Sequence, residues 1–505
     1  MKRFFAKISR FFWSLGFLKF VLWTVTIVVL LYAEEDWRGA RAWAAAKAKW
    51  EAKGETFDYA KFIPPPVPDS ENLGAVPLFQ YSHDELPVFD KATEIFTDTP
   101  PSVLPPTGDW MKGVLPDVAK MRDYVAVYYP KFIRGGAMPA YPLAQFDGLF
   151  PFEGQLKEES AKRPFCRFDG GYSYAPPDAR PLRVLAAQIT VSKIITLHAL
   201  LCLDQHRPDL ALVDLKLNQK LALGAARDPT LIGSLVCIGL NSISGTAIYY
   251  GLVQHEWSDA QLAEIEEMSD QMNFLAMYQF AFRGEAAGCV EDINFYRHLK
   301  QSELHGLFSG TGSYARIPEA AVWWMLPWPG GWWDQNKCLM ADFYLAFPEV
   351  VDLKTRRIFP ERAKAQQQDV DEIKTRWDSA APWRIWFSVA AGPFTAPAIK
   401  FSFVQARTAV TQIACALERF RLAHGNYPNT LGELVPDCIH ALPHDIMNGE
   451  AYHYRLNADG TFLLYSVGWN QTDDGGKVVF KKDAPTQVDY EQGDWVWPTP
   501  KAAGK

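Results

Sequence analysis

The stretch IKFSFVQARTAVTQIACALERFRLAHGNYP, residues 399–428, decides how the C-terminal part of this chain folds. Its apolar residues recur at alternating spacings of four and three, which places them in one stripe along a helix. The stripe consists of Ile399, Phe403, Ala406, Val410, Ile413, Leu417 and Phe420. The cations Arg419, Arg421 and His424 come just before Gly425, an order that is typical of a helix end. The sequence therefore predicts a long amphipathic helix that ends at residue 424.

A short segment and a small antiparallel sheet are predicted to follow this helix. Residues 431–435 have the pattern of a single amphipathic turn. The runs 451–456 and 461–467 have the composition of strands, and the pair Asp459-Gly460 between them indicates a hairpin. A last strand is expected at 477–481, beyond an acidic loop.

The run 416–428, ALERFRLAHGNYP, resembles the soluble domain of the major pseudopilins of type II secretion. The match continues with Leu431, Leu434, Pro436, Pro443, Asp445, Asn448, Gly449, Tyr452, Tyr454 and the run LYSVG at 464–468. It covers about a fifth of the chain, and the whole chain is similar to a group of uncharacterised, membrane-anchored bacterial proteins that carry this module at the C-terminus. The resemblance implies a long helix packed on a small antiparallel sheet. Here the helix is internal, whereas in a pseudopilin it follows a short leader.

A calcium site is also implied by the resemblance, because in pseudopilins the loop after the matching strand binds calcium. The corresponding positions here are Ser466, Asn470, Asp473, Asp474 and Asp494, with Asp489 as an alternative to Asp494. Calcium takes about six to eight oxygen ligands on a turning backbone, and Gly475-Gly476 provides a turn. The alternative interpretation is a solvated Asp-Asp-Gly-Gly turn.

The N-terminal segment predicts a membrane anchor. Residues 11–33 are apolar apart from Lys19 and a few small polar residues, and they are long enough to cross a bilayer. Five basic residues and no acidic residue lie within 1–33, while Glu34, Glu35 and Asp36 follow. By the positive-inside rule, the N-terminus is cytoplasmic and the bulk of the chain is periplasmic or otherwise extracytoplasmic. An uncleaved signal anchor is favoured over a cleaved signal peptide, because Leu31 suits a cleavage site poorly.

Composition narrows the possible partners. The 505 residues are 48% hydrophobic, enough for more than one core, and the net charge is −7. Because the first 33 residues are basic, the rest is more acidic than this total, which argues against nucleic acid as a partner. The seven cysteines form no CxxC pair, so a sulfur-based metal site is not favoured, and Cys202, Cys237 and Cys415 are expected to be buried in helices.

The segment after the anchor is predicted to be a helix followed by irregular chain. Residues 37–53 read as a helix leaving the membrane, with Trp37, Trp43 and Trp50 near one face. Packing of this face against the next domain is favoured over contact with lipid headgroups. Prolines at 64–68 indicate an extended linker, and 70–178 is irregular apart from a candidate strand at 123–129.

From Asp178 onward the sequence predicts helices. They cover about 178–203 and 209–226, then begin again at Asp228-Pro229 and at Ser258, where Gln261 completes a capping box. Corresponding helices begin about 50 residues apart, which suggests two stacked helical hairpins, as in an α-solenoid. Further helices are expected at about 290–304, 339–347, 361–377 and 383–394.

No catalytic motif was found. The chain has no phosphate-binding loop, no GxSxG and no HExxH, and no spacing singles out a pair among carboxylates such as Glu285, Glu291 and Asp292. His298 and His305 share a helix face without a third ligand. The Trp-rich stretch 323–333 is interpreted as core or a seam between domains, and a sugar-binding surface is the alternative.

These patterns predict a mainly α-helical protein with an N-terminal transmembrane helix and a C-terminal α+β pseudopilin-like module. The expected segments are a cytoplasmic tail and anchor (1–36), a juxtamembrane helix with a wrapping segment (37–177), a helical scaffold (178–395) and the module (396–505). We expect a single-pass inner-membrane protein that acts as a non-catalytic scaffold or interaction protein, with other envelope proteins as partners. The pseudopilin resemblance suggests a secretion-related role. An envelope hydrolase acting on cell-wall or polysaccharide substrates is the alternative.

Overall fold

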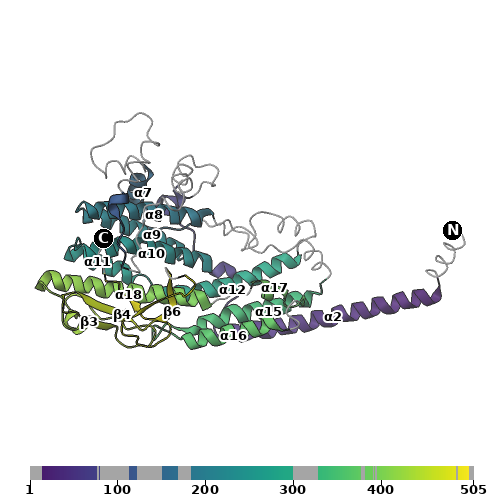
Figure 1. Ribbon diagram of the computed structural model, residues 1–505. Coiled ribbons are helices and arrows are strands. Elements are labelled where there is room, and N and C mark those ends of the chain that lie inside the picture. The colour runs from purple at the N-terminus through teal and green to yellow at the C-terminus, as the bar shows by residue number, and fades with distance from the viewer. Residues whose placement is uncertain are drawn as a thin grey trace.

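A computed structural model of the protein describes residues 14–76, 79, 113–121, 151–168, 183–298, 328–376, 381–390, 392, 395–484 and 487–499. The protein is mainly helical, with small antiparallel sheets near the C-terminus and a long apolar helix near the N-terminus (Figure 1). This confirms the expected fold class at that level. The predicted strand at 123–129 lies outside the described residues.

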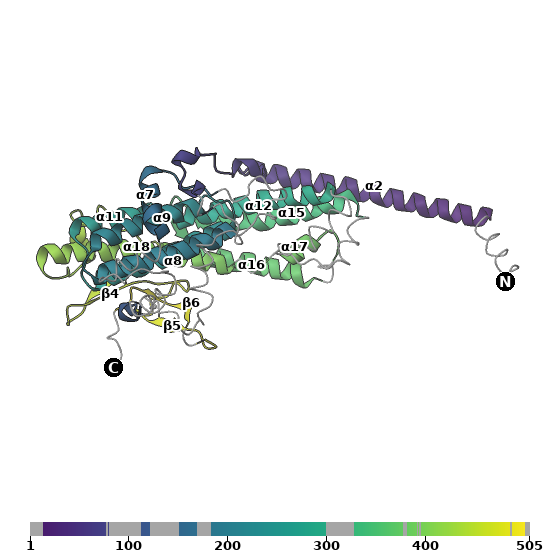
Figure 2. The same ribbon diagram turned by 90° about the horizontal axis from the view of Figure 1, so that it is seen from above.

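The N-terminal helix α2 (Leu15–Glu51) is longer than expected. The anchor and the helix at 37–53 were predicted as separate elements, but they form one continuous helix. No proline interrupts the chain between them, and the Ala-rich part has a high helix propensity. Ser14 caps the start by accepting from the Phe17 backbone N–H at 3.1 Å. The apolar half projects beyond the rest of the molecule (Figures 1 and 2). By length and composition this half could cross a membrane, as signal anchors and signal sequences do.

Three helices that follow one another in the chain pack against one another: α8 (Arg183–Asp204), α9 (Pro208–Ala225) and α10 (Leu231–Val253). The apolar α10 also has the composition of a membrane span, but more than half of its apolar window is buried, as in the core helix of a soluble protein. Its N-cap is Thr230, whose hydroxyl accepts from Gly233 N–H, so the predicted Asp228 cap is wrong. Asp228 instead accepts from the Thr230 N–H and hydroxyl.

The helix α11 (Asp259–Asp270) begins with the predicted Ser258–Gln261 capping box. It packs along the C-terminal helix α18, however, while α10 packs on α8 and α9. The predicted stack of two hairpins is therefore wrong: the apolar face of α11 is covered by a helix from the end of the chain.

A second group of helices consists of α12 (Phe274–His298), α15 (Gly330–Ala346), α16 (Pro360–Thr375) and α17 (Ile385–Ala390). Two of them begin earlier than predicted, α12 by about four turns and α15 inside the Trp-rich stretch. The 3-10 helix η7 (Phe347–Val350) and a two-residue hairpin, β1 (Val351–Asp352) with β2 (Arg357–Ile358), follow α15 and were not predicted.

The described tryptophans of the Trp-rich stretch belong to the core. Trp328 and Trp333 are buried, and Trp332 is partly buried against Trp328 and Trp383. Trp333 also packs against Trp386 of α17. This confirms the core interpretation for these residues, while Trp323 and Trp324 lie outside the described part of the chain.

Short segments wrap the helices. They are the 3-10 helices η1 (Tyr59–Lys61), η2 (Asp69–Glu71) and η3 (Leu73–Ala75), and α7 (Pro151–Lys162). Asn72 joins two of these segments, because its side chain donates to Arg167 O at 2.8 Å and accepts from Arg167 N–H at 2.7 Å. Cys202, Cys237 and Cys415 are buried as predicted.

The C-terminal region contains the predicted helix and hairpin. The helix α18 (Thr395–His424) ends at Gly425, whose φ is 81°. The 3-10 helix η8 (Leu431–Leu434) follows, and β3 (His453–Leu456) then pairs antiparallel with β4 (Phe462–Ser466).

The sheet is closed by a strand that was not predicted. The strand beside β4 is β7 (Trp495–Val496), whereas β5 (Val478–Phe480) pairs with β6 (Val488–Gly493) in a separate two-stranded sheet. The expected last strand therefore exists, but it does not extend the β3–β4 sheet.

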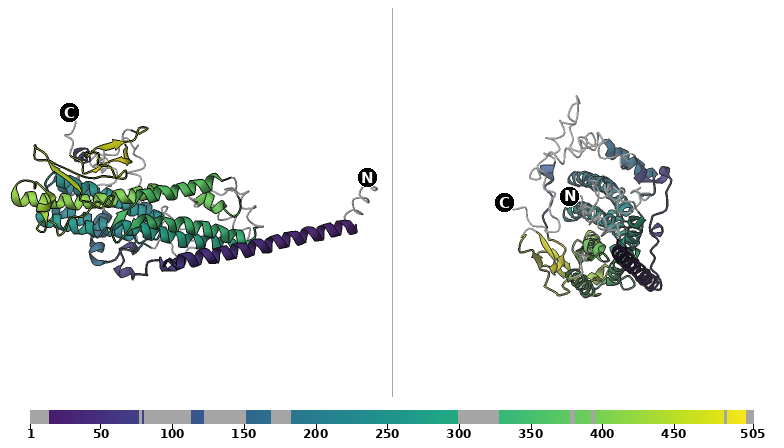
Figure 3. Two further views of the ribbon diagram at one scale, coloured as in Figure 1. Left: turned by 90° about the horizontal axis from the view of Figure 1, so that it is seen from below. Right: turned by 90° about the vertical axis from the view of Figure 1, so that its right-hand side faces the viewer.

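Burial of α18 is greater than one amphipathic stripe implies. Almost every residue from Ala398 to Glu418 is buried, because α11 and α12 cover one side and the strands lie on the other (Figures 1 and 3). One hydrophobic cluster joins Leu200 and Ile265 of the helical region to Leu417 and Leu464 of the C-terminal region. The core is thus continuous across the predicted boundary at residue 395.

Replacing Leu417 with alanine tests this core. Leu417 is fully buried, so Leu417→Ala should lower the free energy of unfolding by about 2–5 kcal/mol. The matched control is Leu422→Ala on the same helix, where the side chain is 44% exposed. Denaturant unfolding of the purified full chain, followed by circular dichroism, measures both. Equal effects of the two substitutions would contradict the burial of Leu417.

Candidate functional site

A pocket of about 310 Å³ lies where α10, α18 and the β3–β4 hairpin meet. Its polar lining comes from His255 after α10, from Glu418 and Arg421 on α18, and from Tyr427 in the turn after α18. The apolar lining comes from Leu252, Val253, Ala414, Phe462 and Trp497. Asp459 and Thr461 of the hairpin turn also line it, so the pocket has apolar walls with polar groups on two sides, as ligand-binding pockets commonly do.

Glu418 is the centre of that polar cluster. Its carboxylate accepts from Arg421 Nε at 2.9 Å and Nη2 at 2.6 Å, and from the Tyr427 hydroxyl at 2.9 Å. His255 Nδ1 lies 2.8 Å from Glu418 Oε1, on a residue whose φ is 57°. Arg421 follows Glu418 by one helical turn, and the chain reversal at Gly425 returns Tyr427 to the same carboxylate.

The electrostatics of the cluster keep Glu418 charged. Burial raises the pKa of Glu418, but the hydrogen bonds from Arg421 and His255 and their positive charge outweigh burial, so the net pKa is lowered. Burial and the neighbouring Glu418 carboxylate raise the pKa of Tyr427, so this phenol stays protonated as a donor. Because all four contacts engage one carboxylate, Glu418 ties the end of α18 to the end of α10 and is a poor candidate for a general base.

The acidic loop brings three of the predicted calcium ligands together. Asp494 is buried, and its carboxylate accepts the backbone N–H groups of Asp474, Gly476 and Lys477 at 3.3, 2.7 and 3.2 Å. The Asn470 side chain donates to Asp474 Oδ2 at 3.0 Å. Burial raises the pKa of Asp494, the loop amides lower it, and the nearby Asp474 raises it.

The remaining predicted ligands have other partners. Asp473 accepts from the Tyr465 hydroxyl and from Gly475 N–H, both at 2.9 Å. The buried Ser466 accepts from Gly468 N–H at 3.2 Å, and Asp489 accepts from Glu491 N–H at 3.0 Å. Asp494 fixes this loop through three backbone amides without a cation.

Two side-chain clusters were missed by sequence reasoning. The first is the Glu418 cluster, for which the sequence offered only the i,i+3 spacing of Glu418 and Arg421 on one helix. The second joins His198, Cys202 and Asp214 inside the bundle. Spacing places His198 and Cys202 on one helix face, but no local pattern predicts their contact with Asp214.

The chain matches no protein-family model, no curated protein and no solved structure. The resemblance to pseudopilins therefore rests on the motif residues of the C-terminal region alone.

Replacing Glu418 with glutamine tests the cluster. At pH 7, Glu418→Gln should lower the free energy of unfolding by about 1.5–3 kcal/mol, the range for hydrogen bonds to a charged group. Because the folded-state pKa lies below the usual value of 4.5, the stability from Glu418 is present above pH 4.5 and is lost as pH falls through the folded-state pKa. The deficit of the variant should therefore shrink in acid. The control is Glu450→Gln on the exposed surface, and a deficit independent of pH would contradict this assignment.

Calcium should raise the melting temperature of the full chain if the acidic loop binds it. A site that contributes about 1 kcal/mol would shift the midpoint of this 505-residue chain by about 1 °C, because the entropy of unfolding grows with chain length. The substitutions Asp473→Ala and Asp474→Ala together should remove the shift, whereas Asp483→Ala, on the exposed surface, should retain it. Identical melting curves in calcium and in chelator would leave an ordinary turn held by Asp494.

Proposed function

We propose that this protein is a single-pass inner-membrane protein whose body lies outside the cytoplasm and serves as a scaffold for other envelope proteins. The observation that carries the proposal is the continuity of α2, in which an exposed apolar half runs directly into a half docked on the body. Phe20, Leu22 and Leu30 are each more than 60% exposed. Large apolar side chains exposed along a whole helix are favourable in hydrocarbon and costly in water.

The docked half of α2 begins at the acidic residues that follow the apolar segment. Asp36 Oδ1 accepts from Gly331 N–H at 2.9 Å, so α2 supplies the anionic cap that Pro329 cannot give to α15. Glu35 accepts from Trp332 Nε1 at 2.9 Å and from Gln335 Nε2 at 3.2 Å.

Backbones of α2 and α15 touch beside these hydrogen bonds. A Cβ atom at Gly39 would overlap the Gly331 carbonyl, and a Cβ atom at Gly331 would overlap the Glu35 carbonyl. Both positions therefore require glycine for this close approach.

Further contacts continue along α2. Asp342 accepts from Lys49 Nζ at 2.8 Å and from Trp50 Nε1 at 2.7 Å, and Lys53 pairs with Glu349 at 2.6 Å. A membrane helix fixed to the body over this length would hold the body at a set orientation to the bilayer. Such an arrangement suits a protein that presents a surface to neighbours.

The C-terminal region gives the proposal its secretion-related character, because it combines a long helix with a small antiparallel sheet, as the pseudopilin resemblance implies. Two observations favour a scaffold over the alternative hydrolase. Glu418 in the pocket is engaged by His255, Arg421 and Tyr427, and the described tryptophans Trp328 and Trp333 are buried and offer no sugar-binding surface.

Protease accessibility tests the orientation. Protease added to spheroplasts should digest the body and leave the N-terminus shielded, because five basic residues precede or enter the apolar segment and acidic residues follow it. A body that resists protease until the inner membrane is lysed would place it in the cytoplasm and overturn the proposal.

Affinity purification from cross-linked membranes tests the scaffold. The full chain should retain envelope proteins. The Gly331→Val variant, in which α2 is separated from α15, should lose them. Hydrolysis of cell-wall polymer by the purified chain would favour the enzyme instead.

A further inference from the structure

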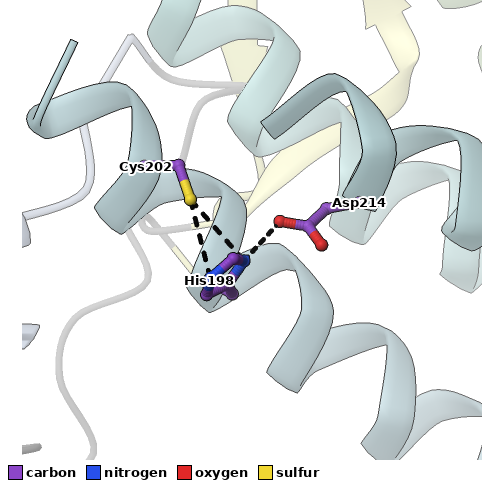
Figure 4. A group of neighbouring side chains, drawn as sticks. All are labelled: His198, Cys202 and Asp214. Atoms are coloured by element: carbon purple, nitrogen blue, oxygen red, sulfur yellow. Dashed lines mark hydrogen bonds and ion pairs between the residues drawn. The ribbon is translucent and has the colours of Figure 1, made fainter. Parts of the chain in front are cut away.

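Three side chains with metal-ligating atoms meet inside the helical bundle, away from the pocket and the acidic loop. His198 and Cys202 come from α8 and Asp214 comes from α9, and their ligand atoms all lie within 4.8 Å of one another (Figure 4). All three residues are buried. Cys202 follows His198 at the i+4 position, so both side chains project from one face of α8 toward the neighbouring helix.

The distances suit a tetrahedral transition-metal ion. Cys202 Sγ lies 3.6 Å from His198 Nδ1 and 3.7 Å from Nε2. A tetrahedral zinc ion with usual bond lengths to sulfur and nitrogen separates these two ligands by about 3.6 Å. Because Sγ is almost equally distant from both nitrogens, it faces the ring, and the imidazole has to turn so that one nitrogen lone pair points to the ion. Asp214 Oδ2 is 2.6 Å from His198 Nδ1, a hydrogen-bond distance that has to lengthen to about 3.3 Å when both atoms bind one ion.

A cation already lies at this cluster. Lys157 on α7 reaches in from the surface, and its Nζ is 2.6 Å from Asp214 Oδ1 and 3.2 Å from His198 Nδ1. The Lys157 side chain is 21% exposed, whereas Asp214 is fully buried. A buried carboxylate needs a compensating positive charge, and the flexible lysine can withdraw to solvent if another cation replaces it.

We propose that His198, Cys202 and Asp214 bind a divalent transition-metal ion of the zinc type, and that Lys157 occupies the same position when the ion is absent. The thiolate and imidazole ligands favour such an ion over calcium or magnesium, which prefer oxygen. Binding releases the Cys202 thiol proton to solvent and leaves the fourth position to water. The ion would join α8 to α9 and displace the Lys157 ammonium from the carboxylate.

Cobalt(II) is the probe that tests the site in the full chain, purified in detergent, reduced with a non-thiol reductant and stripped with chelator. One cobalt ion per chain should bind and give the near-ultraviolet absorption of a thiolate-to-cobalt charge transfer, which zinc(II) then removes. Cys202→Ser should lose this absorption. Cys237→Ser, at an equally buried thiol in α10, should retain it.

Lys157→Met separates a metal site from a purely structural ion pair. Removing the competing ammonium should tighten cobalt binding about tenfold or more, because one like charge next to the ion is lost. Circular dichroism is used to check that Lys157→Met is folded. Its cobalt affinity then tests the site even if Cys202→Ser fails to fold. Absence of stoichiometric cobalt uptake by both the natural chain and Lys157→Met would overturn the proposal, as would charge-transfer absorption that persists in folded Cys202→Ser.

Discussion

Burial of the middle of α18, from Ala398 to Glu418, is the constraint on which the rest of the structure depends. Where a helix is covered on nearly every face, its buried polar side chains have to find partners within the protein. The hydroxyls of Ser402, Thr408 and Thr411 donate to carbonyls of their own helix. The longer side chains reach other elements: Gln405 accepts from Phe274 N–H at the start of α12, Arg407 donates to Val496 O on β7, and Glu418 binds His255 after α10. Each of these longer side chains thus fixes one neighbour against α18, while the apolar residues supply most of the burial.

The N-terminal helix α2 is joined to the rest of the fold by the same kind of contact. Glu35 and Asp36 directly follow the apolar segment, and they are also the residues that cap and hold the start of α15. The helix α15 in turn packs on α12, which packs on α18. The orientation of the apolar half of α2 is therefore connected to the C-terminal region through a continuous series of packed helices, with no flexible linker between them in the described part of the chain.

Local patterns predicted the elements whose signals lie within the element. The stripe of α18, the capping box of α11 and the Asp-Gly hairpin of β3 and β4 are of this kind. The grouping of Asp494 with Asn470 and Asp474 was expected only from the pseudopilin resemblance. Prediction failed where the partner is distant in sequence. Gly330-Gly331 has the composition of a break, yet α15 begins there, because Asp36, 295 residues away from Gly331, supplies its cap. The hairpin stack failed because α18 replaces α10 as the neighbour of α11. Asp214, Lys157 and His255 reach their clusters only through tertiary packing.

Two of the buried carboxylates, Glu418 and Asp214, illustrate the difference between a structural cluster and the proposed ion site. Glu418 has four contacts from Arg421, Tyr427 and His255, so its oxygens are saturated by groups that belong to the adjoining turns. Asp214 has one contact to each oxygen, from Lys157 and His198, and the lysine comes from outside the core. A soft sulfur atom lies beside that imidazole at the separation of two metal ligands. An ion that displaces Lys157 would gain three ligands while the carboxylate keeps its compensating charge, whereas an ion at Glu418 would have to break three separate interactions to reach one ligand.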